Sequence, residues 1–539
     1  MRLPLALGAI ALTALVVGSV RADDDDSGVG RIDKGVPSAN PATGAPATLV
    51  DPDFALKVIA TGSDPLENPN GVITKFGFLS NGTPTEPDQN TYLVLDHNPG
   101  GPTAGFNYGR HFLFQGHENG GNQAYITRIN LDVTDPNHRI TLLTPGDASG
   151  TTGFSAIDGG TFNPFTKALL FTQETSSAGN GTGKVIQVTL NWPPAVNTLE
   201  NFLGLGGYEG VRNDDEGNIY LIEDIGGTRP GGLGANNIPL KAAAQPNSFV
   251  YRYVPNNPKR IEDGGVLQAL QVIIDGTPVT FNAADPKGDI LSVAQLKLHT
   301  PGTSYPIKWV TIATPPKNNP VSLGSATALA KAAGATPFKR PENLAWLPNS
   351  KFRTFFFTPT GDTDAPTSQV PELAARGSWG SIFRVDLRKD DGDHDRDDRH
   401  VKKDDGTISI FFLGDQVHNS FDNINFANEH QLLVGEDRGD TLHDQLNTLD
   451  SIWAFEVRSK NPKPLRFLAL GRDASASGPG QEDNEPTGIH VSNGSTKKSE
   501  LLGTDDALEE KARGFFTQQH GNNTVYEFVR SRKREHARN

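Results

Sequence analysis

A short strand pattern that recurs six times constrains the fold of this chain more than any other feature of its 539 residues. Each copy is an apolar run that ends in polar or acidic residues, and the copies occupy residues 111–118, 169–174, 220–224, 355–358, 432–437 and 515–520. A small sheet cannot bury both of its faces alone, so repeated small sheets indicate blades packed around a shared axis. We therefore predict an all-β fold, a six-bladed β-propeller-like single domain with loop and short helical insertions.

The composition supports this class and narrows the function. The 58 glycines and 38 prolines interrupt the sequence densely, which favours strands joined by turns. The formal net charge of −14 argues against nucleic acid as a partner and suits a protein that collects cations. The chain has no cysteine, so neither disulfides nor thiolate metal ligands are possible.

Five of the six copies follow a second short strand that starts near an acid. These acids are Asp158, Glu209, Glu342, Asp422 and Glu485. Four of them lie about 14 to 16 residues before the end of the apolar strand, so the two strands are expected to pair in one sheet. Because the innermost strands of a propeller converge on its channel, acids at equivalent strand ends should converge there too.

Converging carboxylates predict a metal site. They raise one another's pKa and repel unless cations neutralise them, and their hard oxygen atoms select calcium or magnesium. The predicted metal ligands are Glu118, Glu174, Glu209, Glu223, Glu342, Asp422 and Glu436. The alternative, that these acids end hairpins and face water, stays open for any single residue. Their recurrence in register favours the channel for the set.

The N-terminus has the features of a secretory signal peptide. Met1 and Arg2 precede an apolar run at residues 3–17, which is too short to cross a bilayer comfortably. The mature protein is therefore expected to be soluble and either secreted or periplasmic, after export by a Sec-type route. We divide the chain into a signal peptide at 1–22, a flexible acidic and proline-rich leader at 23–50, the propeller domain at 51–530 and a basic tail at 531–539.

Short sequence blocks, in a fixed order over roughly residues 105–530, carry a family resemblance. The blocks include His117-Glu118-Asn119, Thr172-Gln173-Glu174, Tyr208-Glu209-Gly210, Arg340-Pro341-Glu342-Asn343, Phe421-Asp422-Asn423 and Gln519-His520-Gly521. Together they resemble the successive signature blocks of the PhoX alkaline phosphatase family. The resemblance implies a six-bladed propeller that hydrolyses phosphomonoesters with a cluster of calcium ions and an iron pair.

The resemblance also implies roles for individual residues. Glu209 and Glu342 would be metal ligands at the core of the site, joined by Asp422 and Glu436. Arg340 would hold the substrate phosphate, a role that its fork of donors suits, so Arg340 and Glu342 are the predicted catalytic residues. A structural pairing of Arg340 with Glu342 or another acid is the alternative.

One block departs from the family pattern. Where the family has an iron-ligating cysteine in a Thr-Cys-Glu-Glu pattern, this chain has Gln173 between Thr172 and Glu174. A neutral amide cannot replace a thiolate as a strong iron(III) ligand, so calcium is expected and the iron pair is not. The signal peptide also lacks the Arg-Arg pair of the family's usual export route. Both departures indicate a calcium-only site that is filled outside the cytoplasm.

Residues 390–398 place acids at alternate positions, as calcium loops do. Basic residues flank this run on both sides, which favours a solvated loop of mixed charge instead.

The sequence thus favours an enzyme, a secreted calcium-dependent phosphatase that acts on a small phosphorylated substrate as a monomer. Two alternatives stay open. The first is another calcium-dependent hydrolase on the same scaffold, such as a lactonase or a phosphodiesterase, because one fold supports several chemistries. The second is a non-catalytic calcium-binding surface or matrix propeller, which the missing cysteine favours.

Overall fold

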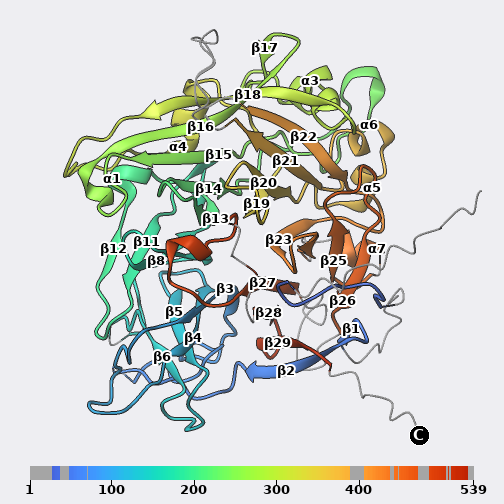
Figure 1. The fold of residues 1–539 in the computed structure, drawn as a ribbon. Helices are drawn as coiled ribbons and strands as arrows, with labels where there is room; N and C mark the ends of the chain where they lie inside the picture. The colour runs from blue at the N-terminus through green and yellow to red at the C-terminus, as the bar shows by residue number, and fades with distance from the viewer. Residues whose placement is uncertain are drawn as a thin grey trace, which may run out of the picture.

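The computed structural model describes residues 27–36, 48–69, 71–147, 149–388, 406–437, 442–446, 448–471, 485–504, 508 and 512–531. Six antiparallel blades surround one axis (Figure 1). The predicted all-β propeller is therefore confirmed. The signal peptide, the acidic run at 390–398 and nearly all of the basic tail lie outside the described residues.

Each blade has four strands that follow one another from the channel outward. The innermost strands are β3 (Glu86–Val94), β7 (Ile157–Asn163), β13 (Tyr208–Asn213), β19 (Pro341–Trp346), β23 (Phe421–Phe426) and β27 (Glu485–Ser492). The labels β3, β13, β19, β23 and β27, which mark five of these inner strands, lie around the centre of Figure 1. The second strands are β4 (His111–Glu118), β8 (Ala168–Gln173), β14 (Ile219–Glu223), β20 (Thr354–Pro359), β24 (Gln431–Glu436) and β28 (Arg513–Gln519).

The outer strands complete the blades. The third strands are β5 (Tyr125–Asn130), β11 (Val185–Thr189), β15 (Val250–Pro255), β21 (Ser381–Leu387), β25 (Ser451–Glu456) and β29 (Thr524–Arg530). The fourth strands are β6 (Ile140–Leu142), β12 (Val196–Thr198), β16 (Gly265–Ile274), β22 (Gly406–Leu413), β26 (Leu465–Ala469) and β2 (Phe54–Ala60).

The N-terminal part of the described chain closes the ring. Strand β2 pairs with β29, so the first and last segments of the propeller share the sixth blade. Strand β1 (Leu49–Val50) pairs with β26 at the edge of the fifth blade, and Ile32 is buried in the core there. Part of the segment that the sequence assigned to the leader, residues 27–36 and 48–50, thus contacts the propeller. The folded region therefore begins before residue 51.

The third and fourth blades carry the largest insertions. Strand β18 (Ser304–Ala313) pairs with both β16 and β22 and joins the two blades into one sheet. Short helices lie in and beside these blades: α2 (Pro286–Ile290), α3 (Val293–Leu298), α4 (Ala326–Ala332), α5 (Ala365–Ser368) and α6 (Pro371–Ala374). None of the helices in the described part of the chain has the length and hydrophobicity needed to cross a membrane.

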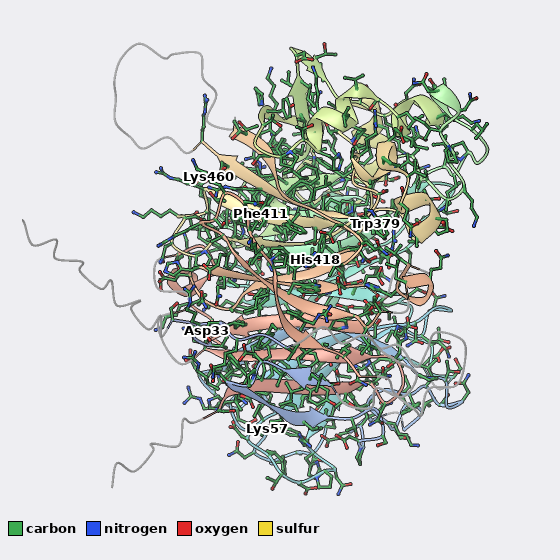
Figure 2. The ribbon with its side chains drawn as sticks, turned by 90° about the vertical axis from the view of Figure 1, so that its right-hand side faces the viewer. Asp33, Lys57, Trp379, Phe411, His418 and Lys460 are labelled. Carbon is green, nitrogen blue, oxygen red and sulfur yellow. The ribbon has the colours of Figure 1, made fainter. Side chains whose placement is uncertain are left out.

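Apolar side chains pack between neighbouring blades. Figure 2 shows the described side chains in a view from the side. Tyr220, Trp346 and Phe355 belong to one buried cluster that spans the third and fourth blades. Phe421 and Phe516 belong to another that spans the fifth and sixth. This packing holds the innermost strands in a ring around the channel.

Every innermost strand has a β-bulge against its second strand. The register shifts lie between Pro87 and Asn90, Ile157 and Gly160, Tyr208 and Val211, Pro341 and Leu344, Phe421 and Ile424, and Thr487 and His490. A bulge bends its strand and redirects a side chain. In five blades the first residue inside the bulge is an acid, namely Asp88, Asp158, Glu209, Glu342 or Asp422, and in the sixth it is Gly488.

The residue after a bulge acid is small or an amide because adjacent blades approach closely there. A Cβ atom at Gly159 would lie 1.8 Å from the carbonyl oxygen of Glu209, and one at Gly210 would lie 2.9 Å from Cα of Asn343. Thr172 and Thr358 also donate hydrogen bonds from their Oγ1 atoms to the carbonyl oxygens of Glu209 and Asp422 in the next blade. The backbone around the bulge acids is therefore held from both sides.

Candidate metal centre

A carboxylate-lined cavity of ≈ 330 Å³ lies where the six blades meet. Its lining residues are Glu86, Asp88, Glu118, Asp158, Glu174, Glu209, Asp224, Arg340, Glu342, Asp422, Asp437, Glu485, Gln519 and His520. Eleven of these side chains are carboxylates, and Arg340 is the only arginine or lysine among the described residues that line the cavity. The six blades thus converge on a strongly anionic channel.

Nine of the eleven cavity acids come from two repeated positions, and the other two, Glu86 and Glu485, begin the innermost strands β3 and β27. The first position is the bulge acid, which five of the six innermost strands have. The second lies at the end of the second strand, where Glu174, Asp224 and Asp437 donate backbone N–H bonds to the carbonyl oxygens of Ala156, Gly207 and Ser420, respectively. In the fourth blade Thr360 N–H makes the equivalent bond to the carbonyl oxygen of Arg340, at 2.7 Å, so a threonine replaces the acid there.

These two positions bring carboxylates together in three adjoining triplets. The triplets are Asp88, Glu118 and Asp158; Asp158, Glu174 and Glu209; and Glu209, Asp224 and Glu342. Within each triplet the possible ligand oxygens lie within 4.8 Å of one another. Because Asp158 and Glu209 are shared, the triplets form a continuous row across the first four blades. Such oxygen donors suit calcium or magnesium.

Burial and mutual repulsion raise the pKa values of these acids. Burial raises the pKa of Asp88 to about 7, and the negative charge of Asp437 adds to the rise. The same two causes, burial first and neighbouring carboxylates second, raise the pKa well above its usual range at Glu118, Asp158, Glu174, Glu209, Glu342, Asp422 and Glu485. A row of this kind is costly to ionise without a compensating cation.

Several buried carboxylate oxygens have no hydrogen-bond partner among the described residues. They are Asp88 Oδ1, Asp158 Oδ1 and Glu209 Oε2, and every triplet contains at least one of them. Buried polar atoms are nearly always satisfied in folded proteins. Cations bound along the row would satisfy these oxygens, so the residues present fit a cluster of hard metal ions.

Arg340 is the cationic member of the cavity. Its Nε donates a hydrogen bond to Asp224 Oδ2 at 2.9 Å, and its Nη2 lies 3.7 Å from both Glu342 Oε1 and Asp437 Oδ2. The backbone of Arg340 has φ of +50°, a left-handed conformation that a non-glycine residue adopts only when its surroundings enforce it. The arginine therefore lies beside the third triplet and is held there by acids of three blades.

Two comparisons with known proteins bear on this site. The sequence profile of the family described as alkaline phosphatase PhoX matches residues 242–462. Among solved structures, Pseudomonas fluorescens PhoX in complex with vanadate, a transition state analogue, matches with a TM-score of 0.50 and 12% identity, covering 92% of this chain and 97% of that chain. The resemblance to the PhoX family is confirmed.

Other solved structures match this chain more weakly. Virginiamycin B lyase from Staphylococcus aureus with quinupristin has 11% identity and a TM-score of 0.31, over 82% of this chain and 99% of that one. A hypothetical selenium-binding protein from Sulfolobus tokodaii has 10% identity and a TM-score of 0.31, over 84% and 94%. No curated protein matches in sequence. At 12% identity, the likeness to the PhoX structure shows the fold.

The position at which the PhoX pattern has a cysteine faces away from the cavity. Gln173 Nε2 donates a hydrogen bond to the carbonyl oxygen of Ser155 at 2.8 Å, and Gln173 does not line the carboxylate row. The possible metal donors of this cavity are therefore carboxylates, with no thiolate at this position.

The structure brings together most of the predicted site residues. Glu118, Glu174, Glu209, Glu342, Asp422 and Arg340 all line the cavity. Their roles in binding metal or substrate stay predictions.

Glu223 and Glu436 do not line the cavity, and their expected place at the channel is corrected. Glu223 accepts hydrogen bonds from Tyr251 OH at 2.7 Å and Thr327 Oγ1 at 2.6 Å. Glu436 accepts from the backbone N–H groups of Asn419 and Ser451. In both cases the following aspartate, Asp224 or Asp437, lines the cavity instead, because consecutive strand residues face opposite sides.

The acids of the first innermost strand, Glu86 and Asp88, were missing from the residues predicted from the sequence. A long connection separates β3 from β4, so Asp88 lies 30 residues before Glu118 and not at the spacing of the other repeats. The acid followed by an amide, Asp88 and Gln89, was the signal that could have identified this strand. Asp158 and Glu485 were recognised as repeated acids but not named as ligands, and both line the cavity.

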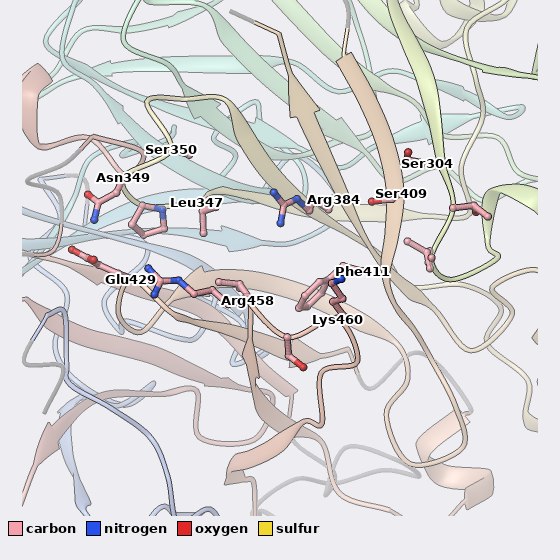
Figure 3. Close-up of a pocket in the computed structure, with 16 residues that line it drawn as sticks. Ser304, Leu347, Asn349, Ser350, Arg384, Ser409, Phe411, Glu429, Arg458 and Lys460 are labelled. Atoms are coloured by element: carbon pink, nitrogen blue, oxygen red, sulfur yellow. The ribbon is translucent and has the colours of Figure 1, made fainter. Parts of the chain in front are cut away.

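A second and larger cavity, of ≈ 840 Å³, lies between the fourth and fifth blades and is shown in Figure 3. Arg384, Arg458 and Lys460 line it, and Glu429 is the only acid among the described lining residues. It has no cluster of carboxylates within the described part of the chain, so it does not compete with the channel as a metal centre.

Proposed function

We propose that this chain is a calcium-dependent phosphatase that hydrolyses phosphomonoesters in the carboxylate channel. The observation that carries the proposal is the row of three adjoining carboxylate triplets with Arg340 beside the third one, in the same cavity. The family profile and the PhoX-like fold support the same reaction class.

The carboxylates and Arg340 would have different roles. The triplets would hold the cations, and bound calcium would polarise phosphoryl oxygens and neutralise the charge that develops on them. Arg340 would donate hydrogen bonds to the substrate phosphate, because a guanidinium recognises phosphate with paired donors. Asp224 would keep the guanidinium oriented through its 2.9 Å hydrogen bond.

Calcium is the metal that the donor set supports best. Carboxylate oxygens are hard ligands, and calcium accepts six to eight of them in flexible geometry. The absence of cysteine argues against an iron pair of the PhoX type, and Gln173, which bonds the carbonyl oxygen of Ser155, does not line the cavity.

A non-catalytic calcium-binding propeller is the second candidate, and the orientation of Gln173 favours it. A chain that lost the iron site could keep the carboxylate row for calcium alone. Another calcium-dependent hydrolase, such as a lactonase or a phosphodiesterase, would use the same row for a different ester.

One experiment separates these functions. The purified protein is stripped with chelator, reloaded with calcium, magnesium or iron(III), and assayed on a phosphomonoester, a phosphodiester and a lactone, with metal content measured on each sample. We expect calcium to bind and to restore phosphomonoester hydrolysis without iron. Calcium binding with no hydrolysis of any substrate between neutral and alkaline pH would favour the binding protein, and hydrolysis of only the diester or lactone would favour the other hydrolases.

We further propose that the protein acts outside the cytoplasm. The signal peptide pattern at residues 1–22 supports export, and a site of calcium carboxylates suits compartments in which calcium is abundant.

A further inference from the structure

We infer that the buried ion pair of Lys339 and Asp362 is a positioning pair that holds Arg340 in the channel. The inference rests on the proposed phosphatase function. It adds that phosphate affinity depends on two residues outside the cavity. Lys339 Nζ lies 2.9 Å from Asp362 Oδ2, and their side chains are only 2% and 0% exposed. Neither residue lines the carboxylate cavity.

A buried ion pair is expensive, which raises the question of what it does. The cost of removing two charges from water largely offsets their attraction, so such a pair adds little net stability. In some proteins a buried ion pair instead fixes one local conformation. The residue that follows Lys339 is Arg340, whose backbone is left-handed, with φ of +50°.

The pair is connected to the backbone of Arg340 through the segment that follows β20. Thr360 N–H donates to the carbonyl oxygen of Arg340 at 2.7 Å, and Gly361 N–H donates to that of Lys339 at 3.2 Å. Asp362, the next residue, then binds the Lys339 side chain. Two consecutive residues just before β19 are thus tied to three consecutive residues just after β20.

Asp362 also anchors this unit to the insertions around it. Its Oδ1 accepts a hydrogen bond from Ala244 N–H at 2.9 Å, and its own N–H donates to the carbonyl oxygen of Ser378 at 2.9 Å. The Lys339 ammonium is therefore bound to an acid that cannot move without disturbing two further segments. Rotation of the Lys339–Arg340 peptide would break these contacts.

The equivalent turns in other blades do not use an ion pair. Ala156 and Ser420 lie two residues before the bulge acids of the second and fifth blades, with φ of +43° and +49°. Ser155 and Asn419 precede them, so neither turn has a lysine at the position of Lys339. The left-handed turn therefore forms without such a pair. In the fourth blade the residue at this turn is an arginine that lines the channel. The ion pair occurs in the blade that has this arginine, which is why we assign it to positioning the arginine.

The test compares variants of the calcium-loaded protein for inorganic phosphate affinity, by titration calorimetry, and for kcat and KM on a phosphomonoester. Lys339→Met should weaken phosphate binding about tenfold and raise KM, as expected when a charge-assisted hydrogen bond is misplaced, while calcium content stays unchanged. Lys339→Gln combined with Asp362→Asn restores a neutral hydrogen-bonded bridge and should recover most of the affinity. The control is Arg513→Met, which breaks a half-buried pair with Glu527 outside the cavity and should leave phosphate affinity unchanged.

The outcomes separate this inference from the proposed function. If the wild-type protein neither binds phosphate nor hydrolyses the ester, the proposed function fails. If the wild type does both and Lys339→Met binds phosphate equally well, the positioning role is overturned. Should Lys339→Met not fold, Lys339→Met with Asp362→Leu removes both buried charges and is measured in its place; failure of both variants to fold would overturn the positioning role in favour of a purely structural one.

Discussion

Arg340 Nε lies 2.9 Å from Asp224 Oδ2, so the one arginine among the described channel residues, from the fourth blade, is held by an acid at the end of a strand in the third. The same Asp224 belongs to the third carboxylate triplet. A guanidinium and a bound cation would therefore share one carboxylate. Substitution of the arginine leaves every carboxylate ligand in place, whereas substitution of an acid removes one, so the two kinds of change should have separable effects.

Replacing Arg340 by lysine should lower phosphomonoester turnover by roughly tenfold or more. Lysine keeps the positive charge but loses the planar fork that binds phosphate with paired hydrogen bonds. Calcium content and melting temperature should stay close to those of the wild type, because the carboxylate row is untouched. Steady-state kinetics with metal analysis on the same samples measures both.

Glu342→Gln is the companion variant. Glu342 belongs to a triplet and is buried, so its loss should reduce activity, calcium content and melting temperature together. If both substitutions lowered stability and neither affected turnover specifically, Arg340 would be a structural partner of the acids.

Asp224→Asn and Glu223→Gln should differ although the residues are adjacent. Asp224 lines the cavity, so its substitution should lower calcium content and activity. Glu223 accepts hydrogen bonds from Tyr251 and Thr327, so glutamine would replace bonds to a charged acceptor with weaker neutral ones and cost about 1 kcal/mol of unfolding free energy. Calcium titration and urea unfolding of both variants measure this, and loss of calcium in Glu223→Gln alone would contradict the assignment.

Removing metal should lower the melting temperature of the wild-type protein, and calcium should restore it. A ligand that binds only the folded state stabilises it by mass action, by about 2.7 kcal/mol per site at a hundredfold excess over Kd. Scanning calorimetry with chelator and then with added calcium measures the shift. An unchanged melting curve in excess chelator would rule out a structural calcium cluster.

The stability of the metal-free protein should fall as pH rises from about 5 to about 8. The cavity acids have folded-state pKa values raised above their unfolded values of about 4, to about 7 for Asp88, so between these limits the folded state binds more protons. Stability present at low pH is therefore lost as the pH passes through the raised pKa values. With calcium the trend should weaken or reverse, because cations bind the ionised carboxylates.

The urea midpoint of unfolding, measured at about pH 5 and about pH 8 with either chelator or calcium, tests this pH dependence. Salt at about 1 M screens the general repulsion of an acidic protein, so the remaining dependence reports on the buried row. If the urea midpoint of the metal-free protein rose with pH, the proposed repulsion among the buried carboxylates would be contradicted.

The sequence by itself determined the class of fold and the general place of the site. Strands such as residues 169–174 and 432–437 are apolar runs with polar ends, and repetition of small sheets leaves few ways to bury their faces. The acid followed by a small or amide residue, as in Asp158-Gly159, was visible because close approach of adjacent blades excludes a larger side chain there. The lack of cysteine, a matter of composition alone, was enough to exclude a thiolate ligand.

Only the tertiary structure decided which acids meet. Glu223 and Asp224 differ by one position, and consecutive strand residues face opposite sides, so the choice between them depends on where the strand enters the ring and where the bulge in its partner falls. Asp88 was hidden because a connection of variable length separates it from Glu118, and no local pattern records which strands pair. The contact of Arg340 with Asp224 likewise joins residues far apart in the chain, and only the packed blades bring their charges together. Lys339 and Asp362 meet within one blade, because the pairing of β19 with β20 places them side by side.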